Sequence, residues 1–235
     1  TWTRIFKDMN EHLSMLSDGF LTLSNSNVSF EQIRDQWRTI LHSQNPQRYP
    51  RGLVGISVAQ LASELFKVDT IVSSSQHSCT FCEYAEDPVD DRLGYVVHAD
   101  SSVTGSTAEW IDKLSQKTRR VCLDCRTQMQ QILFYNDVPP ILVLEYPQRS
   151  IVTSHKLEFE TENGTKTLDL RGIVYHGQYH FTSRIISSQK QVWYHDGMTT
   201  GKSCSYDGML NNMTDNDLRK CRQRYLSLAV YAQQL

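Results

Sequence analysis

The chain has 235 residues, of which 39% are hydrophobic, and a formal net charge of -2, so it can bury one core. This charge gives no global basic field for nucleic acid, and no apolar run approaches the ~20 residues needed to cross a bilayer. The first residues, Thr1-Trp2-Thr3-Arg4, include neither an initiator methionine nor the apolar core of a signal peptide. We therefore expect one soluble domain cut from a longer protein.

The first seventy residues have the pattern of helices. Apolar residues from Ile5 to Phe20 recur close to a 3.6-residue period, which predicts an amphipathic helix. Residues 29–32 and 57–60 each have the form of a capping box that opens a further helix. The first box is followed by four residues expected to face inward: Ile33, Trp37, Ile40 and Leu41.

Two Cys-x-x-Cys pairs follow, about forty residues apart. Four thiolates in this arrangement can close a tetrahedral zinc site, and cysteines so close in sequence rarely bridge each other outside redox centres. The alternative, redox-active or secreted-protein disulfides, draws support from three Asn-x-Ser/Thr tripeptides, which we expect to be unused because zinc thiolates indicate a reducing compartment. The predicted ligands of a structural zinc are Cys79, Cys82, Cys122 and Cys125.

The pattern after residue 67 changes to short strands. Residues 68–72, 93–98 and 141–146 are β-branched, alternating or continuously apolar and predict strands, and a short helix capped at Ser106 lies between the second and third. An amphipathic helix is expected from about Asp215 to Gln234. Helices first, antiparallel strands later and a zinc-tied insertion between them predict the α+β class.

Two neighbouring segments, 175–182 (YHGQYHFT) and 193–197 (WYHDG), place a histidine at the head of one strand and an aspartate just after the next. A histidine can take a thiol proton near neutral pH, and a carboxylate on its other ring nitrogen fixes the tautomer and stabilises the imidazolium. This is the order in which a cysteine peptidase presents its general base and the carboxylate that orients it. The nucleophile is not in these segments.

Other histidines compete for the same role. His176 lies four residues before His180 in a predicted strand, so both side chains should share one face, and His176 is either a second base or a packed histidine. His195 should face away from Asp196 and be exposed. A metal site formed by His176, His180 and Asp196 fits by ligand type, but no His-Glu-x-x-His helix or comparable spacing supports it.

The order of these motifs resembles the ubiquitin-specific protease family of cysteine peptidases (peptidase C19, ubiquitin carboxyl-terminal hydrolases). The helix that ends at Phe66 stands where that family has a Gln-Gln-Asp-Ala-x-Glu-Phe-Leu helix. Two Cys-x-x-Cys knuckles, a strand opened by a proline at 140–144, a histidine box and a tryptophan-aspartate box follow in the family's order. The resemblance covers nearly the whole chain.

The resemblance implies one papain-like peptidase domain over residues 1–235, incomplete at its N-terminus. Its parts would be a helical thumb over 1–70, zinc-bearing β fingers over 71–130 and a β palm over 131–235. Carried over residue by residue, the catalytic histidine is His180 and the catalytic aspartate is Asp196. The four knuckle cysteines match the zinc ligands of the fingers, a β-ribbon that grips the globular part of ubiquitin.

Three departures from the family pattern limit this comparison. Tyr179 replaces the glycine that precedes the histidine, and residues 56–58 (ISV) replace the glutamine-glutamine-aspartate helix start. The cysteine box, an Asn-x-x-Cys-Tyr-like opening of a helix, is absent. Since that box precedes the thumb in the family, the nucleophile is expected upstream of Thr1. Cys204 and Cys221 are expected to be small core or surface thiols.

The implied function is that of a thiol-dependent deubiquitinase-type isopeptidase, which cleaves ubiquitin or a ubiquitin-like modifier from conjugates in the cytoplasm or nucleus. No nucleic acid and no membrane is expected among its partners, and this chain alone is expected to be inactive. A second reading is a catalytically inactive, zinc-stabilised pseudo-peptidase that binds ubiquitin or SUMO. A third is a SUMO-directed isopeptidase, because His180-Phe181-Thr182 replaces Gly-His-Tyr.

Overall fold

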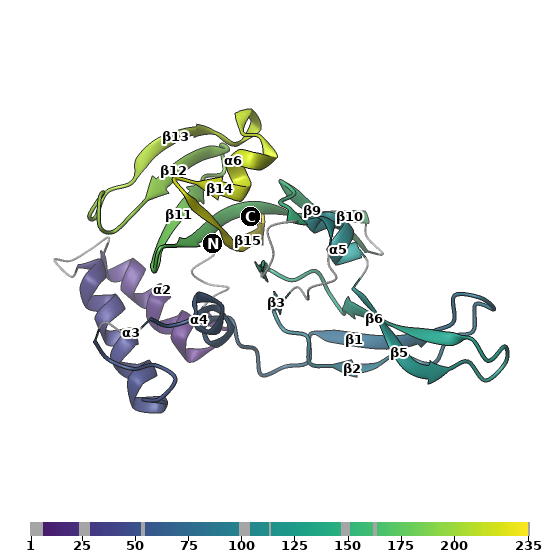
Figure 1. Ribbon diagram of the computed structural model, residues 1–235. Coiled ribbons are helices and arrows are strands. Elements are labelled where there is room, and N and C mark those ends of the chain that lie inside the picture. The colour runs from purple at the N-terminus through teal and green to yellow at the C-terminus, as the bar shows by residue number, and fades with distance from the viewer. Residues whose placement is uncertain are drawn as a thin grey trace. The chain divides into compact units, whose positions relative to one another are not determined.

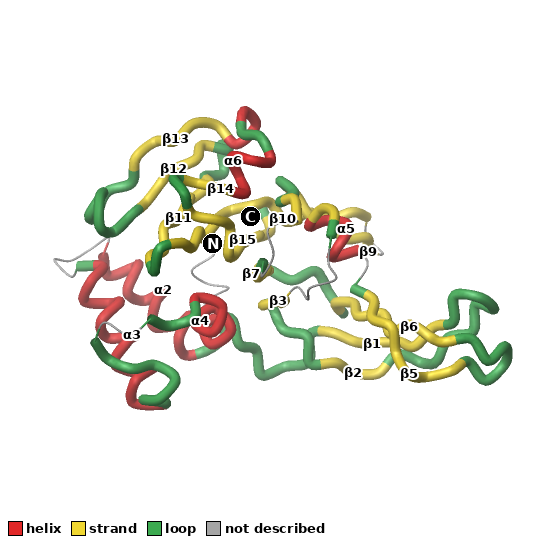
Figure 2. Tube along the Cα trace, viewed as in Figure 1, coloured by secondary structure: helices red, strands yellow, loops and turns green. Residues whose placement is uncertain are grey.

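The computed structural model describes residues 7–23, 29–52, 55–98, 104–112, 114–146, 151–161 and 164–234 (Figure 1). The chain forms two compact units, which consist of residues 1–69 and residues 70–234. The first unit is helical, and the second consists mainly of strands (Figure 2). All three sheets of the described residues, and both candidate sites named above, belong to the second unit.

Within the described residues of the first unit, the helices with full bounds are α2 (Glu11–Leu23), α3 (Phe30–Gln44) and α4 (Val58–Leu65), and the last two have defined side-chain caps. Ser29 and Gln32 form the predicted capping box of α3. The Ser57 hydroxyl accepts the Gln60 N–H at 3.4 Å, as the sequence predicts for α4. Side-chain caps of this kind satisfy backbone N–H groups that have no partner inside the helix. The helix starts in this unit are therefore encoded locally.

Packing between α2 and α3 depends on a glycine. A Cβ on Gly19 would lie 2.8 Å from two carbon atoms of Ile33, so the two helices approach closely at that point. Ile33 and Leu41 are buried as predicted. Ile40 was expected to face inward but is 36% exposed, and Phe20, the last residue of the predicted apolar period, is 49% exposed. The period thus places α3 correctly only in part, and Ile5 lies outside the described residues.

A four-stranded antiparallel ribbon opens the second unit: β1 (Ser73–Ser78), β2 (Val89–Asp91), β5 (Ser115–Val121) and β6 (Gln128–Tyr135). The strand order is β2-β1-β6-β5. The strand predicted at 68–72 is wrong, because the first strand begins at Ser73. Its Ser73 and Ser75 are buried between β2 and β6, so pairing with neighbours overrides the weak strand propensity of serine.

A larger sheet carries the candidate dyad. Its path runs β13-β12-β11-β10-β15-β7-β3, with β14 paired to β15 and β9 to β10, and every pair is antiparallel except β3 with β7. The predicted strands at 93–98 and 141–146 contain β3 and β7, which are shorter. The bounds are β3 (Val96–His98), β7 (Ile141–Glu145), β9 (Lys156–Thr161), β10 (Gly164–Gly177), β11 (His180–Ile186), β12 (Gln191–His195), β13 (Ser205–Met209), β14 (Lys220–Cys221) and β15 (Arg224–Gln233).

The C-terminal helix predicted over 215–234 is wrong. Only α6 (Asp215–Arg219) is helical there, opened by a capping box between Thr214 and Asp217. The rest forms β14 and β15, and β15 lies between β10 and β7 in the sheet. A strand buried on both faces has a nearly continuous apolar sequence, which periodicity cannot distinguish from a buried helix. The residues that produce this pattern are Leu226, Leu228, Ala229, Tyr231 and Ala232.

The main core of the second unit lies against one face of the large sheet. Short elements close it: α5 (Thr107–Asp112), the paired strands β4 (Gly105–Ser106) and β8 (Ile151–Val152), and the 3-10 helix η1 (Leu210–Asn212). Ser106 caps α5 as predicted, because its hydroxyl accepts the Glu109 N–H at 3.2 Å. On β11 and β12 the core-facing rows include Ile186 and Val192. His180 lies on the same face of β11 as Ile186, and Asp196 continues the face of β12 that carries Val192. Packing of Ile186 and Val192 in the core therefore determines which way the two dyad side chains face.

Candidate functional site: a histidine-aspartate dyad and a four-cysteine cluster

His180 and Asp196 form a hydrogen-bonded dyad. His180 Nε2 lies 2.7 Å from Asp196 Oδ1. β11 and β12 are antiparallel with Ser183 opposite His195, and this register brings the first residue of β11 close to the residue that follows β12. The Asp196 side chain is 4% exposed and that of His180 is 22% exposed. The pairing expected from sequence is therefore present, with the carboxylate buried and the imidazole accessible.

A two-residue turn decides which histidine joins the dyad. Gln178 and Tyr179 connect β10 to β11 with φ of +53° and +58°, the sign that a type I′ hairpin turn requires. Across this hairpin His176 is opposite Phe181, and their rings stack with centroids 4.5 Å apart. The expectation that His176 and His180 share one face is wrong, since their four-residue spacing includes the turn. His176 therefore does not share a centre with His180 and Asp196, and these three residues, which fitted a metal site only by ligand type, form no ligand group among the described residues.

Both oxygens of the Asp196 carboxylate accept hydrogen bonds. Oδ1 also accepts the Met198 N–H at 3.0 Å, and Oδ2 accepts the Tyr194 hydroxyl at 3.3 Å. The hydrogen bond from His180 holds the pKa of Asp196 well below its ordinary value, with further lowering by the Met198 N–H and the Thr199 side chain, while burial opposes the shift. Asp196 therefore stays ionised and acts as an acceptor at neutral pH.

The backbone of Asp196 is held by the turn that follows it. The Thr199 and Thr200 N–H groups donate to the Asp196 carbonyl at 3.0 and 2.7 Å. The Asp196 N–H donates to Thr200 Oγ1 at 3.1 Å. With Nε2 engaged by Asp196, Nδ1 is the ring nitrogen of His180 that remains for another partner. An imidazole oriented by a buried carboxylate is suited to general-base chemistry on a nucleophile placed at Nδ1.

The two single cysteines are set apart from this dyad. Cys221 is 4% exposed and packs in the main core, and burial raises the pKa of its thiol. Cys204 is exposed. Neither hydrogen-bonds to His180. Both positions agree with the expectation that each is a small core or surface thiol. His195 was expected to be exposed, but it is half-buried with Nε2 3.1 Å from the Gly201 carbonyl.

A buried arginine braces β11 next to the dyad. Arg184 Nε donates to Asp207 Oδ2 at 2.7 Å, and Nη1 donates to the Tyr175 hydroxyl at 3.0 Å and to the Asp217 carbonyl. These contacts join β11 to β10, β13 and α6. Because each partner comes from a different element, Arg184 limits movement of the strand that carries His180. The sequence pattern did not single out this residue.

The four knuckle cysteines gather at one end of the ribbon. Their sulfur atoms all lie within 4.8 Å of one another, and the Cys79–Cys125 and Cys82–Cys122 sulfur pairs are 3.4 Å apart. A tetrahedral zinc with Zn–S bonds of about 2.3 Å places its sulfurs roughly 3.8 Å apart, which lies between these distances. All six cysteines are free thiols, so the disulfide alternative is not what the structure shows. The cluster is compatible with a structural zinc.

The two knuckles have the same backbone shape. In each, the residue after the second cysteine has positive φ, namely Glu83 at +61° and Arg126 at +62°. The N–H of the first cysteine then bonds a carbonyl five residues on, Cys79 to Tyr84 and Cys122 to Thr127, both at 2.8 Å. Repetition of one turn on two strands directs two sulfurs from each side toward a common centre. This arrangement explains why two distant Cys-x-x-Cys motifs can act as one ligand set.

The electrostatics of the cluster also favour a cation. Hydrogen bonds from the Thr127 side chain and backbone lower the pKa of Cys125 to about 6. The pKa of Cys82 is raised to about 12: the Tyr84 backbone lowers it, but contact with the Cys122 sulfur, burial and the two other cysteine sulfurs together raise it more. Crowded thiols resist losing several protons in the absence of a positive charge. A dication at the centre would remove that repulsion.

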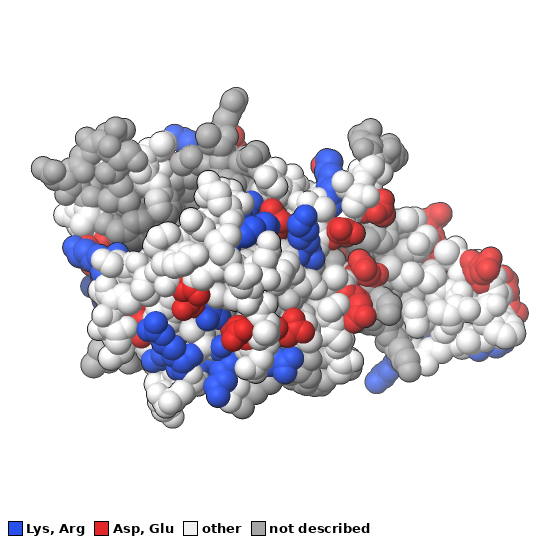
Figure 3. Space-filling view, turned by 90° about the horizontal axis from the view of Figure 1, so that it is seen from above, with Lys and Arg blue, Asp and Glu red and all other residues white. Residues whose placement is uncertain are grey.

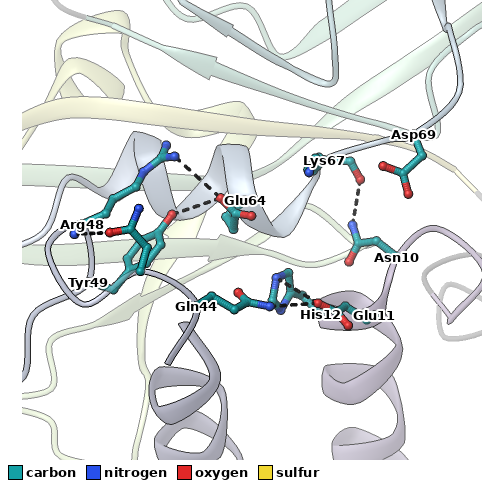
Figure 4. A pocket seen from close by; sticks show the side chains of 10 residues that line it. Asn10, Glu11, His12, Gln44, Arg48, Tyr49, Glu64, Lys67 and Asp69 are labelled. Atoms are coloured by element: carbon teal, nitrogen blue, oxygen red, sulfur yellow. Dashed lines mark hydrogen bonds and ion pairs between the residues drawn. The ribbon is translucent and has the colours of Figure 1, made fainter. Parts of the chain in front are cut away.

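A polar cavity of about 560 Å³ lies within the helical unit (Figure 4). The Tyr49 hydroxyl donates to Glu64 at 3.2 Å, and Gln44 donates to Glu11 at 3.0 Å. The side-chain amide of Asn10 donates to the Leu65 and Lys67 carbonyls at the end of α4. These polar groups are engaged with one another and connect the three helices, so we assign the cavity a structural role.

On the face drawn in Figure 3, Lys and Arg lie among Asp and Glu over part of the surface, and Asp and Glu predominate toward the right of the view. Some of them pair, as Lys190 does with Asp169 at 2.7 Å. Among the described helices, none has both the length and the apolar character needed to span a membrane.

The chain has a ubiquitin-specific-protease-like fold. It is similar to a solved SAGA DUB module of Ubp8, Sgf11, Sus1 and Sgf73, with a TM-score of 0.56 and 12% identity over 95% of this chain and 58% of that one. Two further structures of this module, one bound to monoubiquitin and one to ubiquitin aldehyde, give TM-scores of 0.48 and 0.49 at 14% and 16% identity. Each match covers 86% of this chain, and 48% and 49% of the respective partner chain.

The chain thus spans about half the length of the structures it matches. No protein-family model matches the sequence, and no curated protein does. At these identities the likeness establishes the fold alone.

Sequence reasoning missed the residues that hold Asp196. Tyr194 could have been found, because it lies two residues before Asp196 on a strand and must share its face. Met198 and Thr200 contribute through a turn, whose geometry the sequence does not display. Arg224, with Nη1 4.0 Å from Asp196 Oδ2, arrives from β15, a segment expected to be helical. Its approach could not be predicted before the sheet order was known.

Proposed function

We propose that this chain carries the base and the orienting carboxylate of a thiol-dependent isopeptidase, which removes ubiquitin or a ubiquitin-like modifier from conjugates. The observation that carries this proposal is the 2.7 Å hydrogen bond between accessible His180 and buried Asp196. The ubiquitin-specific-protease-like fold and the four-cysteine cluster support it. Family membership in the ubiquitin-specific proteases is part of the proposal.

In the proposed reaction, His180 Nδ1 takes the thiol proton and the thiolate attacks the carbonyl carbon of the modifier's terminal glycine. The C–N bond to the target lysine then breaks, a thioester forms, and the imidazolium gives its proton to the leaving amine. Water, activated by His180, hydrolyses the thioester to a carboxylate and restores the thiol. Asp196 keeps Nε2 protonated and stabilises the imidazolium without leaving its place.

We place the nucleophile in a segment upstream of Thr1, as the family order implies. The six cysteines of this chain have other positions: four form the cluster, Cys221 packs in the core, and Cys204 is exposed without a bond to His180. The four-cysteine cluster would hold a structural zinc that stabilises the ribbon as fingers. An intracellular location, cytoplasmic or nuclear, fits reduced zinc thiolates.

The test uses a ubiquitin C-terminal reporter and a thiol-directed ubiquitin probe. A lone imidazole is a poor catalyst of amide cleavage, so the 235-residue chain should neither hydrolyse the reporter nor be captured by the probe. A longer parent chain should be captured upstream of Thr1. Capture that maps to Cys204 or Cys221 would contradict this assignment.

A second candidate is a pseudo-peptidase that binds a modifier without cleaving it, which is favoured because His180 bonds Asp196 and no thiol within the described ranges. Calorimetric titration of the chain with ubiquitin and with SUMO distinguishes the modifiers. Binding, together with an inert longer chain, would select this reading. Turnover of a SUMO reporter but not of a ubiquitin reporter would select the SUMO-directed isopeptidase.

A further inference from the structure

The turn between β14 and β15 is unfavourable by itself. Arg222 and Gln223 both have positive φ, +44° and +69°, a conformation that side chains other than glycine rarely adopt. Arg224 follows with its side chain 17% exposed. Its Nε is buried and has no hydrogen-bond partner within the part of the chain that the structure describes. The strained turn and the half-buried guanidinium with few hydrogen bonds both disfavour the folded state, so a contribution to folding stability does not explain them.

This turn lies against the hairpin that presents His180. A Cβ on Gly177 would be 3.3 Å from both Cα and Cγ of Arg224 and 3.4 Å from the Gln223 carbonyl oxygen. Gly177 is also the residue opposite His180 across the hairpin. The glycine therefore makes room for Arg224 at the point where the catalytic strand begins. Two separate turns are packed together beside the dyad.

Arg224 lies near the second oxygen of Asp196, and Arg222 lies over the ring of the tyrosine that donates to this oxygen. Arg224 Nη1 is 4.0 Å from Oδ2. The guanidinium carbon of Arg222 lies 3.9 Å from the centroid of the Tyr194 ring, and the Tyr194 hydroxyl donates to the same Oδ2. A cation over an aromatic face at this distance is attractive. One oxygen of Asp196 thus faces His180, and the other faces a positively charged turn.

We infer that Arg224 is a positioning residue that holds Asp196 Oδ2, so that Oδ1 stays directed at His180 Nε2, with Arg222 and Tyr194 in support. This inference deepens the proposed function, since it rests on His180 as the base. An opposite charge at 4.0 Å opposes rotation of the carboxylate, and the attraction is stronger at a buried oxygen than in water. In the family pattern stated above, no motif assigns this role to an arginine.

The test follows the proton between His180 Nε2 and Asp196 by NMR in the 15N-labelled 235-residue chain. Arg224→Met keeps the aliphatic stem and removes the charge. It should speed exchange of this proton with water about tenfold, which corresponds to ~1.4 kcal/mol. Arg224→Lys should restore most of the protection. The matched control is Arg171→Met, because Arg171 pairs with Asp169 elsewhere in the sheet and should leave the proton unchanged.

A second variant covers the case in which Arg224→Met does not fold. Gly177→Ala pushes a Cβ against Arg224 and should speed the same exchange while the charge is kept. Unchanged exchange in both variants would overturn the inference, as would an equal effect of Arg171→Met. In an active longer chain, Arg224→Met should lower kcat about tenfold with little change in KM.

The inference and the proposed function fail separately. An altered His180 proton in a longer chain that neither cleaves nor is captured would overturn the peptidase reading and support the role of Arg224. An unaltered proton in an active longer chain would overturn the role of Arg224 alone.

Discussion

Removal of metal from the four-cysteine cluster should unfold the end of the ribbon and leave the large sheet intact. Among the described residues, the apolar cluster there consists of Cys79, Cys122 and Met129, with Tyr84 and Cys125 packed against it. Burial of a methionine side chain contributes about 1.5–3 kcal/mol, whereas zinc binding by short zinc-finger peptides is worth ~10 kcal/mol or more. The metal, not the apolar contacts, should therefore hold the two knuckles together.

Hydrogen exchange of two backbone amides measures this directly. The N–H groups of Cys79 and Cys122 each close a knuckle through a 2.8 Å bond, so both should lose protection when a chelator removes the metal. A loss of only ~3 kcal/mol would speed their exchange roughly a hundredfold, since each 1.4 kcal/mol is a factor of about ten. The Leu170 amide, bonded to the His155 carbonyl in the large sheet, should keep its protection.

A pair of cysteine variants supplies the control. Cys82→Ser removes one ligand and should reproduce the effect of the chelator, while Cys204→Ser changes an exposed thiol outside the cluster and should have none. Elemental analysis should find about one zinc per chain. Metal-free protein with four reactive knuckle thiols, unchanged protection at Cys79 and Cys122 and unchanged thermal stability would refute the reasoning.

Two further predictions concern the dyad. His180→Ala in the longer chain should remove most turnover of a modifier reporter. His176→Ala should have a far smaller effect, because the His176 ring stacks on Phe181 on the other face of the hairpin. Equal losses would mean that the wrong histidine has been chosen. Asp196 should contribute stability that depends on pH. Its pKa lies below the ordinary value of 3.8, chiefly because of the hydrogen bond from His180, so the contribution is complete above about pH 5 and is lost as the pH falls below the ordinary value. Urea unfolding between about pH 6 and about pH 2.5 should therefore show a steeper acid loss for the native chain than for Asp196→Asn, and parallel curves would contradict this.

Local signals in the sequence predicted local structure well. Ser29, Ser57 and Ser106 each accept a backbone N–H at the start of a helix, as their sequence contexts indicate. The cysteine spacing predicted a four-sulfur cluster, because ligand sets of this kind depend on short turns that the motif itself encodes. These features require no knowledge of the rest of the fold.

Signals that depend on partners were misleading. β15 was expected to be helical because an apolar run buried on both faces fits either state, and only its position between β10 and β7 makes it a strand. β1 was missed because its serines form a strand only when two neighbouring strands pair with it. In both segments the deciding interactions come from residues far away in sequence, which a window of local sequence does not contain.

The dyad shows where the two kinds of signal meet. Residue order suggested His180 with Asp196, but the spacing along one strand left His176 open as a competing base or a packed histidine. The turn at Gln178 and Tyr179 removes that ambiguity, because it reverses the chain and sends the two histidines to opposite faces. Type I′ turns favour Asn-Gly, so a Gln-Tyr turn carries little sequence signal and is held by the register of the hairpin. The pairing of β10 with β15 also brings Arg224 close to Asp196, because Gly177 leaves room for the Arg224 backbone and side chain. The residue types in the sequence thus indicate which chemistry this site can perform, whereas strand pairing determines which of those residues come together.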